Sequence, residues 1–215
     1  MKENLLLFAC FFAGILLGNL DAVPQWIITP QLPSLLLMLL VLQVGLGFGA
    51  DAGLRDTIRS LRPSMVLLPL FTICGTLLFA ALGALVPGSR SLTECLAVGS
   101  GFGYYSLSSV LIADLYVPHL GPQAAAELAA VALLANVIRE MCTLFGLPLF
   151  ARWCGRLAPI SAAGINSMDV CLPGIVRYVA DGFRLVPMAV LHGLVLEVSV
   201  PILIGIYSKL RQSDK

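Results

Sequence analysis

Runs of apolar residues dominate the pattern of this chain. Each run is about 20 residues long, so as a helix it could cross a bilayer core about 30 Å thick. Short polar stretches separate them. The first run is predicted to be a retained span, because Glu3 disrupts the basic leader of a signal peptide and further spans follow. We predict about five transmembrane helices, over Leu5 to Leu20, Pro33 to Ala50, Pro63 to Val86, Pro122 to Phe150 and Leu185 to Tyr207.

Two further apolar segments are interrupted in their middles by polar and small residues. Glu94 to Tyr116 contains three closely spaced glycines followed by three serines, and Pro159 to Val179 contains Gly164, Asn166 and Asp169. A continuous helix is poorly favoured over such stretches. Irregular backbone at membrane depth is tolerated only inside protein or along a cavity, so we predict two re-entrant or broken helical hairpins.

The distribution of Lys and Arg favours hairpins over full crossings, because hairpins place most of these residues on the cytoplasmic side. The C-terminal half then becomes a possible inverted pseudo-repeat, a plan found in secondary transporters. We predict one membrane transport domain over residues 1–215. It consists of three spans in 1–86, a hairpin plus span in 94–150, and a second hairpin plus span in 159–208.

Composition supports an all-α integral membrane protein. Hydrophobic residues make up 59% of the chain and charged residues only 12%, and the mean hydropathy is +0.95. The formal net charge of +1 argues against nucleic acid as a partner. The six cysteines form no CxxC pair, so neither a metal nor another cofactor is expected. An enzyme is not expected either, because no HExxH or GxSxG motif is present.

The most informative charges are Arg139 and Glu140, in the middle of an otherwise uncharged span. Charges at membrane depth cost about 2.5 to 3.5 kcal/mol each, so they persist mainly where they face protein or water. Asn136, Arg139, Glu140 and Thr143 share one polar stripe of the predicted helix. Arg139 could simply neutralise an acid such as Asp114 or Asp169, whereas for Glu140 we favour binding a cation and exchanging a proton.

The interrupted segments add the remaining candidates. A half-helix starting near Ser106 would direct its positive end toward the midplane, which suits a carboxylate. Asp169 would lie nearby if the two hairpin tips meet, although it could instead be the N-cap of its own helix. His192 is either a hydrogen-bonded core residue or a proton relay. The candidate substrate-binding and proton-coupling residues are Tyr105, Ser106, Ser108, Asn136, Arg139, Glu140, Asn166, Ser167, Asp169 and His192.

Several motifs, in order and spacing, resemble those of the LysO-type lysine exporters of bacterial inner membranes. The resemblance extends from roughly Leu35 to Tyr207. The motifs that support it are Gly99-Ser-Gly-Phe-Gly-Tyr-Tyr-Ser-Leu-Ser108, Arg139-Glu140, Ser167-Met-Asp169, Val186-Pro-Met-Ala-Val-Leu-His-Gly193 and Val200-Pro-Ile-Leu203.

This resemblance implies a multi-pass inner-membrane protein that exports L-lysine and its analogue thialysine, driven by proton antiport. The family's intramembrane acids correspond to Glu140 and Asp169, whereas Glu197 matches no acid of the family pattern. Longer members have additional N-terminal spans, so a homodimer or a small separately encoded membrane subunit is expected as partner.

Two other hypotheses remain open. An inorganic-cation antiporter coupled to protons could use the same acids, but it would not need a helix end that binds a carboxylate. A membrane subunit without transport activity of its own would bind no amino acid.

Overall fold

A computed structural model describes residues 63–213 except 87, 89 and 181, together with residues 13, 16 and 17. The chain divides into two compact units, residues 1–59 and 60–215, and the helices discussed below all belong to the second unit. The predicted spans Leu5 to Leu20 and Pro33 to Ala50 therefore lie outside the described residues, apart from three helical positions in the first. The single transport domain over residues 1–215 remains a prediction.

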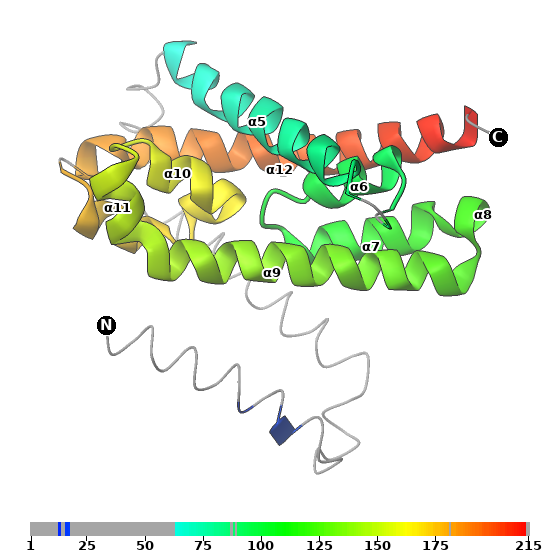
Figure 1. The fold of residues 1–215 in the computed structure, drawn as a ribbon. Coiled ribbons are helices and arrows are strands. Elements are labelled where there is room, and N and C mark those ends of the chain that lie inside the picture. The colour runs from blue at the N-terminus through cyan, green and yellow to red at the C-terminus, as the bar shows by residue number, and fades with distance from the viewer. Residues whose placement is uncertain are drawn as a thin grey trace, which may run out of the picture. The chain divides into compact units, whose positions relative to one another are not determined.

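The second unit is built from helices, and the described residues contain no strand (Figure 1). In chain order the elements are η1 (Pro63–Val66), α5 (Leu67–Gly83), α6 (Leu92–Gly99), α7 (Tyr105–Leu115), α8 (Val117–Leu120), α9 (Pro122–Trp153), α10 (Ala158–Ala163), η2 (Gly164–Met168), α11 (Leu172–Tyr178) and α12 (Gly182–Ser213).

Two of these helices, α9 and α12, are long and apolar enough to cross a membrane. Each has 32 residues, which corresponds to about 48 Å at 1.5 Å per residue. Helix α9 begins at Pro122, as predicted from the sequence, and ends three residues beyond the predicted Phe150. Helix α12 extends beyond the predicted run at both ends. The all-α prediction therefore holds for the described residues, whereas the total number of spans remains a prediction.

The first interrupted segment is a helix broken between Gly99 and Tyr105, where its polar stretch lies. Its two arms are α6 and α7, and α6 begins close to the point where α7 ends. Tyr116, directly after α7, donates a hydrogen bond from its Oη atom to the Thr93 carbonyl oxygen in α6 at 3.3 Å. The second segment is broken likewise, with α10 and α11 joined through η2. Whether either segment re-enters a bilayer remains a prediction.

The two hairpins approach each other from opposite ends of α9 and α12, which run antiparallel (Figure 1). Arg211 in the last turn of α12 forms an ion pair with the buried Glu94 of α6, at 3.1 Å. Arg90 pairs at 3.3 Å with Glu127 in the beginning of α9, so α12 ends where α9 begins. The first hairpin followed by α9 therefore runs in the opposite direction to the second hairpin followed by α12.

Each hairpin has its own apolar cluster. The first cluster joins α6 and α7 to the beginning of α9 and the second half of α12, and it includes Phe102, Ile112 and Leu196. The second joins α10 and α11 to the end of α9 and the beginning of α12, and it includes Leu147 and Ile175. Alanines 125, 129 and 132 of α9 are buried in the first cluster, where small side chains allow helices to pack closely.

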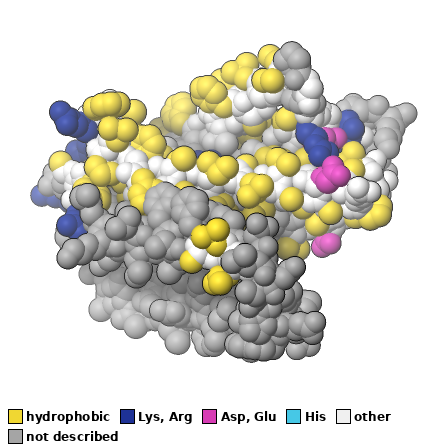
Figure 2. Space-filling view, turned by 60° about the horizontal axis from the view of Figure 1, so that its bottom comes forward, with side chains coloured by type: hydrophobic (Ala, Val, Ile, Leu, Met, Phe, Trp, Pro, Cys, Tyr) yellow, Lys and Arg dark blue, Asp and Glu magenta, His cyan; other side chains and the backbone are white. Residues whose placement is uncertain are grey.

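Apolar side chains also cover much of the surface. On the face in Figure 2, charged side chains gather toward the two ends of the helices and hydrophobic ones occupy the region between them. Helix α5 exposes large side chains such as Phe71 and Phe79. A protein in water rarely exposes a continuous apolar surface of this kind, whereas lipid solvates it.

Replacing Gly164 by alanine is expected to destabilise the protein. A Cβ atom there would collide with the Phe102 carbonyl group of the other hairpin, and a φ of +62° is one that alanine rarely adopts. The substitution should lower the free energy of unfolding by about 1 to 2 kcal/mol or more. The melting temperature of the detergent-purified protein should then fall by about 3 °C or more.

Gly205→Ala is the matched control, because a Cβ atom at this helical glycine meets nothing within 4 Å. Its melting temperature should be unchanged or higher, since alanine favours helix over glycine. An unchanged melting temperature for Gly164→Ala would contradict the close approach of the two hairpins.

Candidate functional site

The break in the first hairpin is held by Asn136, a buried residue in the middle of α9. Its Oδ1 atom accepts a hydrogen bond from the Gly103 backbone N–H at 2.7 Å. Its Nδ2 atom donates to Ser108 Oγ at 3.3 Å and to the Ala132 carbonyl oxygen at 2.8 Å. All polar atoms of this amide are therefore used within the protein, and Asn136 supports the irregular backbone.

Glycine is required where α9 and this break approach each other. A Cβ atom at Gly101 would collide with the Asn136 amide. Gly103 has a φ of +97°, a conformation that glycine adopts without strain. These glycines therefore allow the predicted break. Helix α7 begins at Tyr105, one residue before the helix start predicted near Ser106.

The second hairpin is held by Arg139 and Thr143, which follow Asn136 on the same stripe of α9. Arg139 Nε donates to the Ala162 carbonyl oxygen at 3.1 Å, and its Nη2 donates to that of Ser161 at 3.0 Å. Thr143 Oγ1 lies 3.1 Å from the same Ala162 oxygen. These carbonyl groups belong to the last turn of α10, where the helix dipole favours a cation.

Arg139 therefore has a structural role, but with partners other than those we considered from the sequence. Among the described residues its hydrogen bonds go to carbonyl oxygens, and it forms no ion pair with Asp114 or Asp169. The hypothesis that Arg139 neutralises an acid is wrong for this part of the chain. Carbonyl groups at a helix end can satisfy an arginine without a carboxylate, which leaves nearby acids available.

The tips of the two hairpins meet. The Ile165 N–H in η2 donates a hydrogen bond to the Phe102 carbonyl oxygen in the first break, at 3.0 Å. Ile165 also packs in the apolar cluster of the first hairpin. Asp169 was expected to lie near the first break if the two hairpin tips meet, and the tips do meet.

Two acids lie at this meeting point. The carboxyl groups of Glu140 and Asp169 are close enough for their charges to interact, and Tyr105 at the start of α7 lies in electrostatic range of both. Both acids are only partly buried. Within the described residues neither forms an ion pair with a basic side chain. The two acids are therefore not neutralised by the surrounding described protein.

Asp169 is not an N-cap residue. Its Oδ1 atom accepts a hydrogen bond from the neighbouring Val170 N–H at 2.5 Å. The N-cap position of α11 is Cys171, two residues later. The alternative that Asp169 caps its own helix is therefore wrong, because its carboxylate accepts hydrogen bonds from the backbone before α11 begins.

Asn166, in η2, contributes an amide to the same region. Its side-chain amide interacts with the Glu140 carboxyl group. The neighbouring Ser167 is fully buried and donates to the Ala189 carbonyl oxygen of α12 at 2.9 Å. Asn166 thus faces the acids, whereas Ser167 fastens the turn to α12.

His192 of α12 lies on the opposite side of η2 and is fully buried. Its Nδ1 atom is 3.2 Å from the Gly164 carbonyl oxygen, and its Nε2 atom is 3.0 Å from Thr72 Oγ1 of α5. Because a carbonyl oxygen only accepts, the neutral ring carries its hydrogen on Nδ1, which leaves Nε2 as the acceptor atom that faces the Thr72 hydroxyl group. The geometry therefore matches a hydrogen-bonded core histidine, which is one of the two alternatives considered from the sequence.

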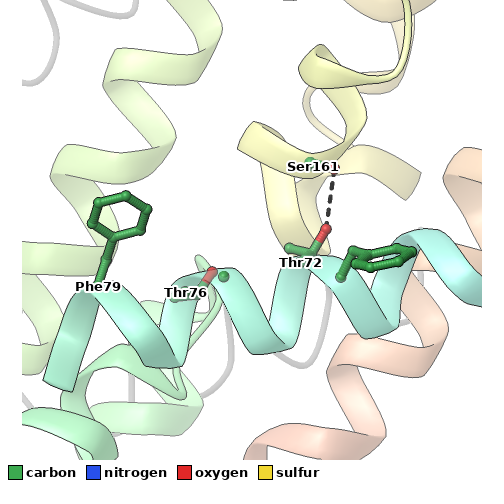
Figure 3. Close-up of a pocket in the computed structure, with 6 residues that line it drawn as sticks. Thr72, Thr76, Phe79 and Ser161 are labelled. Atoms are coloured by element: carbon green, nitrogen blue, oxygen red, sulfur yellow. Dashed lines mark hydrogen bonds between the residues drawn. The ribbon is translucent and has the colours of Figure 1, made fainter.

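Thr72 connects this histidine to the surface. Thr72 and Ser161, whose hydroxyl oxygens are 3.0 Å apart, lie in an open groove of about 440 Å³ that Phe71, Thr76 and Phe79 also line (Figure 3). Sequence reasoning gave no role to Thr72, since a single threonine in an apolar run carries no signal of a partner 120 positions away. Sequence reasoning also gave little weight to Glu197. This residue lies in electrostatic range of Tyr104 at the first break.

The candidate residues therefore separate into two groups. Glu140, Asp169, Asn166 and Tyr105 lie together at the meeting point of the hairpins, and Ser106 follows in the first turn of α7. The remaining candidates are engaged in hydrogen bonds that support the two breaks. They are Ser108, Asn136, Arg139, Ser167 and His192.

Comparison with known protein families gives a clear result. The sequence model of one family, described as Lysine exporter LysO, matches residues 8–208. The chain belongs to this family. No solved structure is detectably similar to this LysO-family chain.

Two curated relatives are similar over part of the LysO-family chain. The Lysine exporter LysO of Escherichia coli is 34% identical over 122 residues, which cover 54% of this chain and 36% of the relative. A protein of Haemophilus influenzae with a provisional lysine-exporter name is 32% identical over 120 residues, which cover 56% of each chain. The similarity thus covers between about a third and about half of the length of these relatives.

Replacing Asn136 by leucine, which has the same branching but no polar atoms, should loosen the first break. The Gly103 N–H then loses its acceptor while staying buried, at a cost of about 1 to 3 kcal/mol. Hydrogen–deuterium exchange should become faster in peptides covering residues 100–105. Ser109→Ala, which removes only a bond to the Ser106 carbonyl oxygen, is the control and should leave this exchange unchanged. Equal exchange in wild type and Asn136→Leu would show that Asn136 does not hold the break.

Proposed function

We propose that this chain is a secondary transporter of the bacterial inner membrane that exports L-lysine by proton antiport. The proposal is supported by the family to which the chain belongs and by the lysine-exporter names of its relatives. Its main structural support is the pair of acids, Glu140 and Asp169, where two broken helices meet without a basic partner among the described residues. Acids at membrane depth commonly mark ion and substrate pathways.

The charges of lysine match the groups at this point. Its two ammonium groups would face Glu140 and Asp169, and its carboxylate would face the beginning of α7. This helix starts at the break, and the side chain of its N-cap residue Tyr104 does not cap it. The first-turn N–H groups of a helix lack intrahelical partners, and its dipole favours an anion there. Tyr105 and Ser106 occupy this first turn.

Thialysine has a sulfur atom in place of one side-chain methylene group, and its charged groups are the same as those of lysine. The same site would therefore export it. The residues that support the two breaks, which include Asn136 and Arg139, would position the acids rather than contact the ligand.

Proton coupling follows from the proximity of the acids. Two neighbouring carboxylates repel each other, so the pair is stabilised by binding either a cation or a proton. Protons entering from outside would displace lysine, and their release to the cytoplasm would reset the site, as alternating access requires. We propose that residues 1–215 act as one transport domain, either as a homodimer or with a small separately encoded membrane subunit.

Replacing Glu140 by glutamine should reduce lysine efflux from proteoliposomes at least about tenfold, which corresponds to about 1.4 kcal/mol of lost interaction with the cation. Glutamine preserves the size of the side chain but removes its charge. Efflux of radiolabelled lysine measures the effect, with the melting temperature as a check of folding.

Glu127→Gln is the matched control, because Glu127 is an exposed acid of the same helix that pairs with Arg90 at its end. This variant should transport at the wild-type rate. Full activity of Glu140→Gln would remove Glu140 from the mechanism.

Efflux should depend on the direction of a pH gradient. Vesicles loaded with lysine should lose it several-fold faster when the outside is acidic than when it is alkaline, because protons then enter as lysine leaves. A protonophore should abolish the difference, and vesicles without protein give the background. Dependence on a sodium gradient alone would instead favour inorganic-cation coupling and contradict proton antiport.

A further inference from the structure

Glu197 is an acid at membrane depth that the proposed mechanism leaves unused. It is the only acid in the sequence of α12 and lies near the middle of this helix, which is long and apolar enough to cross a membrane. Among the described residues it forms no ion pair with a basic side chain. A charge at this depth is costly and persists mainly where it faces protein or water on a functional pathway.

The register of α12 turns Glu197 toward the meeting point of the hairpins. Gly193 lies one turn earlier, and a Cβ atom there would be 2.9 Å from the Ile165 carbonyl oxygen and 2.7 Å from Met168 Cγ, both in η2. Residues four apart share a helix face, so Glu197 continues the stripe that starts at the tip of the second hairpin. The preceding Leu196 is buried in the apolar cluster of the first hairpin. Glu197, which is only partly exposed, is therefore placed beside the first break.

Two adjacent tyrosines connect this acid to the acid pair. Tyr104, the last residue of the first break, lies in electrostatic range of Glu197 and of Asp169. Tyr105 lies in electrostatic range of Tyr104 and of both acids of the pair, Glu140 and Asp169. A tyrosine hydroxyl group can both donate and accept a hydrogen bond. Glu197 is thus linked to the pair through polar side chains, but it belongs to a different helix and a different side of the break.

The charged groups of the described residues around α12 leave Glu197 without a cation. The basic residues of α12 lie near its two ends, at least about 18 Å along the helix from Glu197, and they are Arg184, Lys209 and Arg211. Arg211 is already paired with Glu94 of α6.

Two further titratable groups near the hairpin tips are occupied by other partners. Arg139 of α9 is bonded to carbonyl groups at the end of α10. His192 is turned about 140° from Glu197 around α12 and bonds to Gly164 and Thr72 instead. A proton is therefore the cation that this carboxylate can take up and release without a change of protein partner.

We propose that Glu197 is a second proton-binding site of the transporter, separate from the acid pair that binds lysine. This inference rests on the proposed proton antiport and specifies its stoichiometry. Lysine on Glu140 and Asp169 competes with protons for that pair, whereas it leaves the carboxylate of Glu197 free. In each cycle Glu197 accepts one proton from water on the outer side and releases it to water on the cytoplasmic side. Together with a proton exchanged at the pair, at least two protons enter for each lysine exported.

This stoichiometry determines how far a pH difference can drive lysine. At zero membrane potential the equilibrium ratio of lysine across the membrane changes by about tenfold per pH unit for each proton exchanged. Wild type should therefore reach a ratio of about 100-fold per pH unit, and a protein without the second proton site about tenfold. The ratio is an equilibrium quantity, so a substitution that only distorts the protein slows its approach and does not change it.

The test uses the purified full-length chain in proteoliposomes, with potassium and valinomycin holding the membrane potential at zero. Radiolabelled lysine inside and outside is measured at equilibrium across a series of small pH differences. Glu197→Gln preserves the size of the side chain but binds no proton, so its ratio per pH unit should be about tenfold lower than that of wild type. Glu197→Leu suits an apolar span and should give the same reduced ratio. Glu127→Gln, an exposed acid near the end of α9, is the control and should keep the wild-type ratio.

The outcomes separate the inference from the proposed function. If wild type reaches only about tenfold per pH unit, or if either folded Glu197 variant keeps the wild-type ratio, the second proton site is wrong while proton antiport stands. If the wild-type ratio does not respond to pH, proton antiport fails and the inference fails with it. The wild-type measurement needs no substitution, and Glu197→Leu keeps the test decisive if Glu197→Gln does not fold.

Discussion

The structure depends on satisfying the backbone of two broken helices away from water. Unpaired N–H and C=O groups are costly in an apolar environment, so irregular backbone persists there only with protein partners. One stripe of α9 supplies them: Asn136 accepts from the first break, and Arg139 and Thr143 donate to the second. The Phe102 to Ile165 hydrogen bond then joins the two tips. These contacts fix where every other group of the candidate site lies.

The position of the acids follows from this arrangement. Glu140 comes directly after Arg139 and is turned about 100° from it around the helix, so it is not directed at the carbonyl groups that Arg139 binds. Because those carbonyl groups satisfy Arg139, the acids at the meeting point have no basic partner among the described residues. A structural arginine and an acid available to a ligand can thus be neighbours in sequence.

Much of this architecture could be predicted from the sequence, because it reflects local patterns. The apolar run from Pro122 predicted α9, and the glycines between Gly99 and Gly103 predicted the first break. The same reasoning did not identify the carbonyl groups that Arg139 binds, and it gave no partner to Thr72. Both depend on contacts between distant residues, and a periodic pattern shows which face of a helix is polar but not what that face meets. The predicted roles of Glu140 and Asp169 still require the transport experiments.

The two apolar clusters have a mechanical consequence. Each hairpin packs in its own cluster, whereas a backbone hydrogen bond connects the two tips and Ile165 packs across the boundary between them. Packed cores resist deformation more than interfaces of this kind, so a relative movement of the two hairpins would take place along the plane between them. The acids lie on that plane, where a small displacement of one hairpin alters their separation and their access to water.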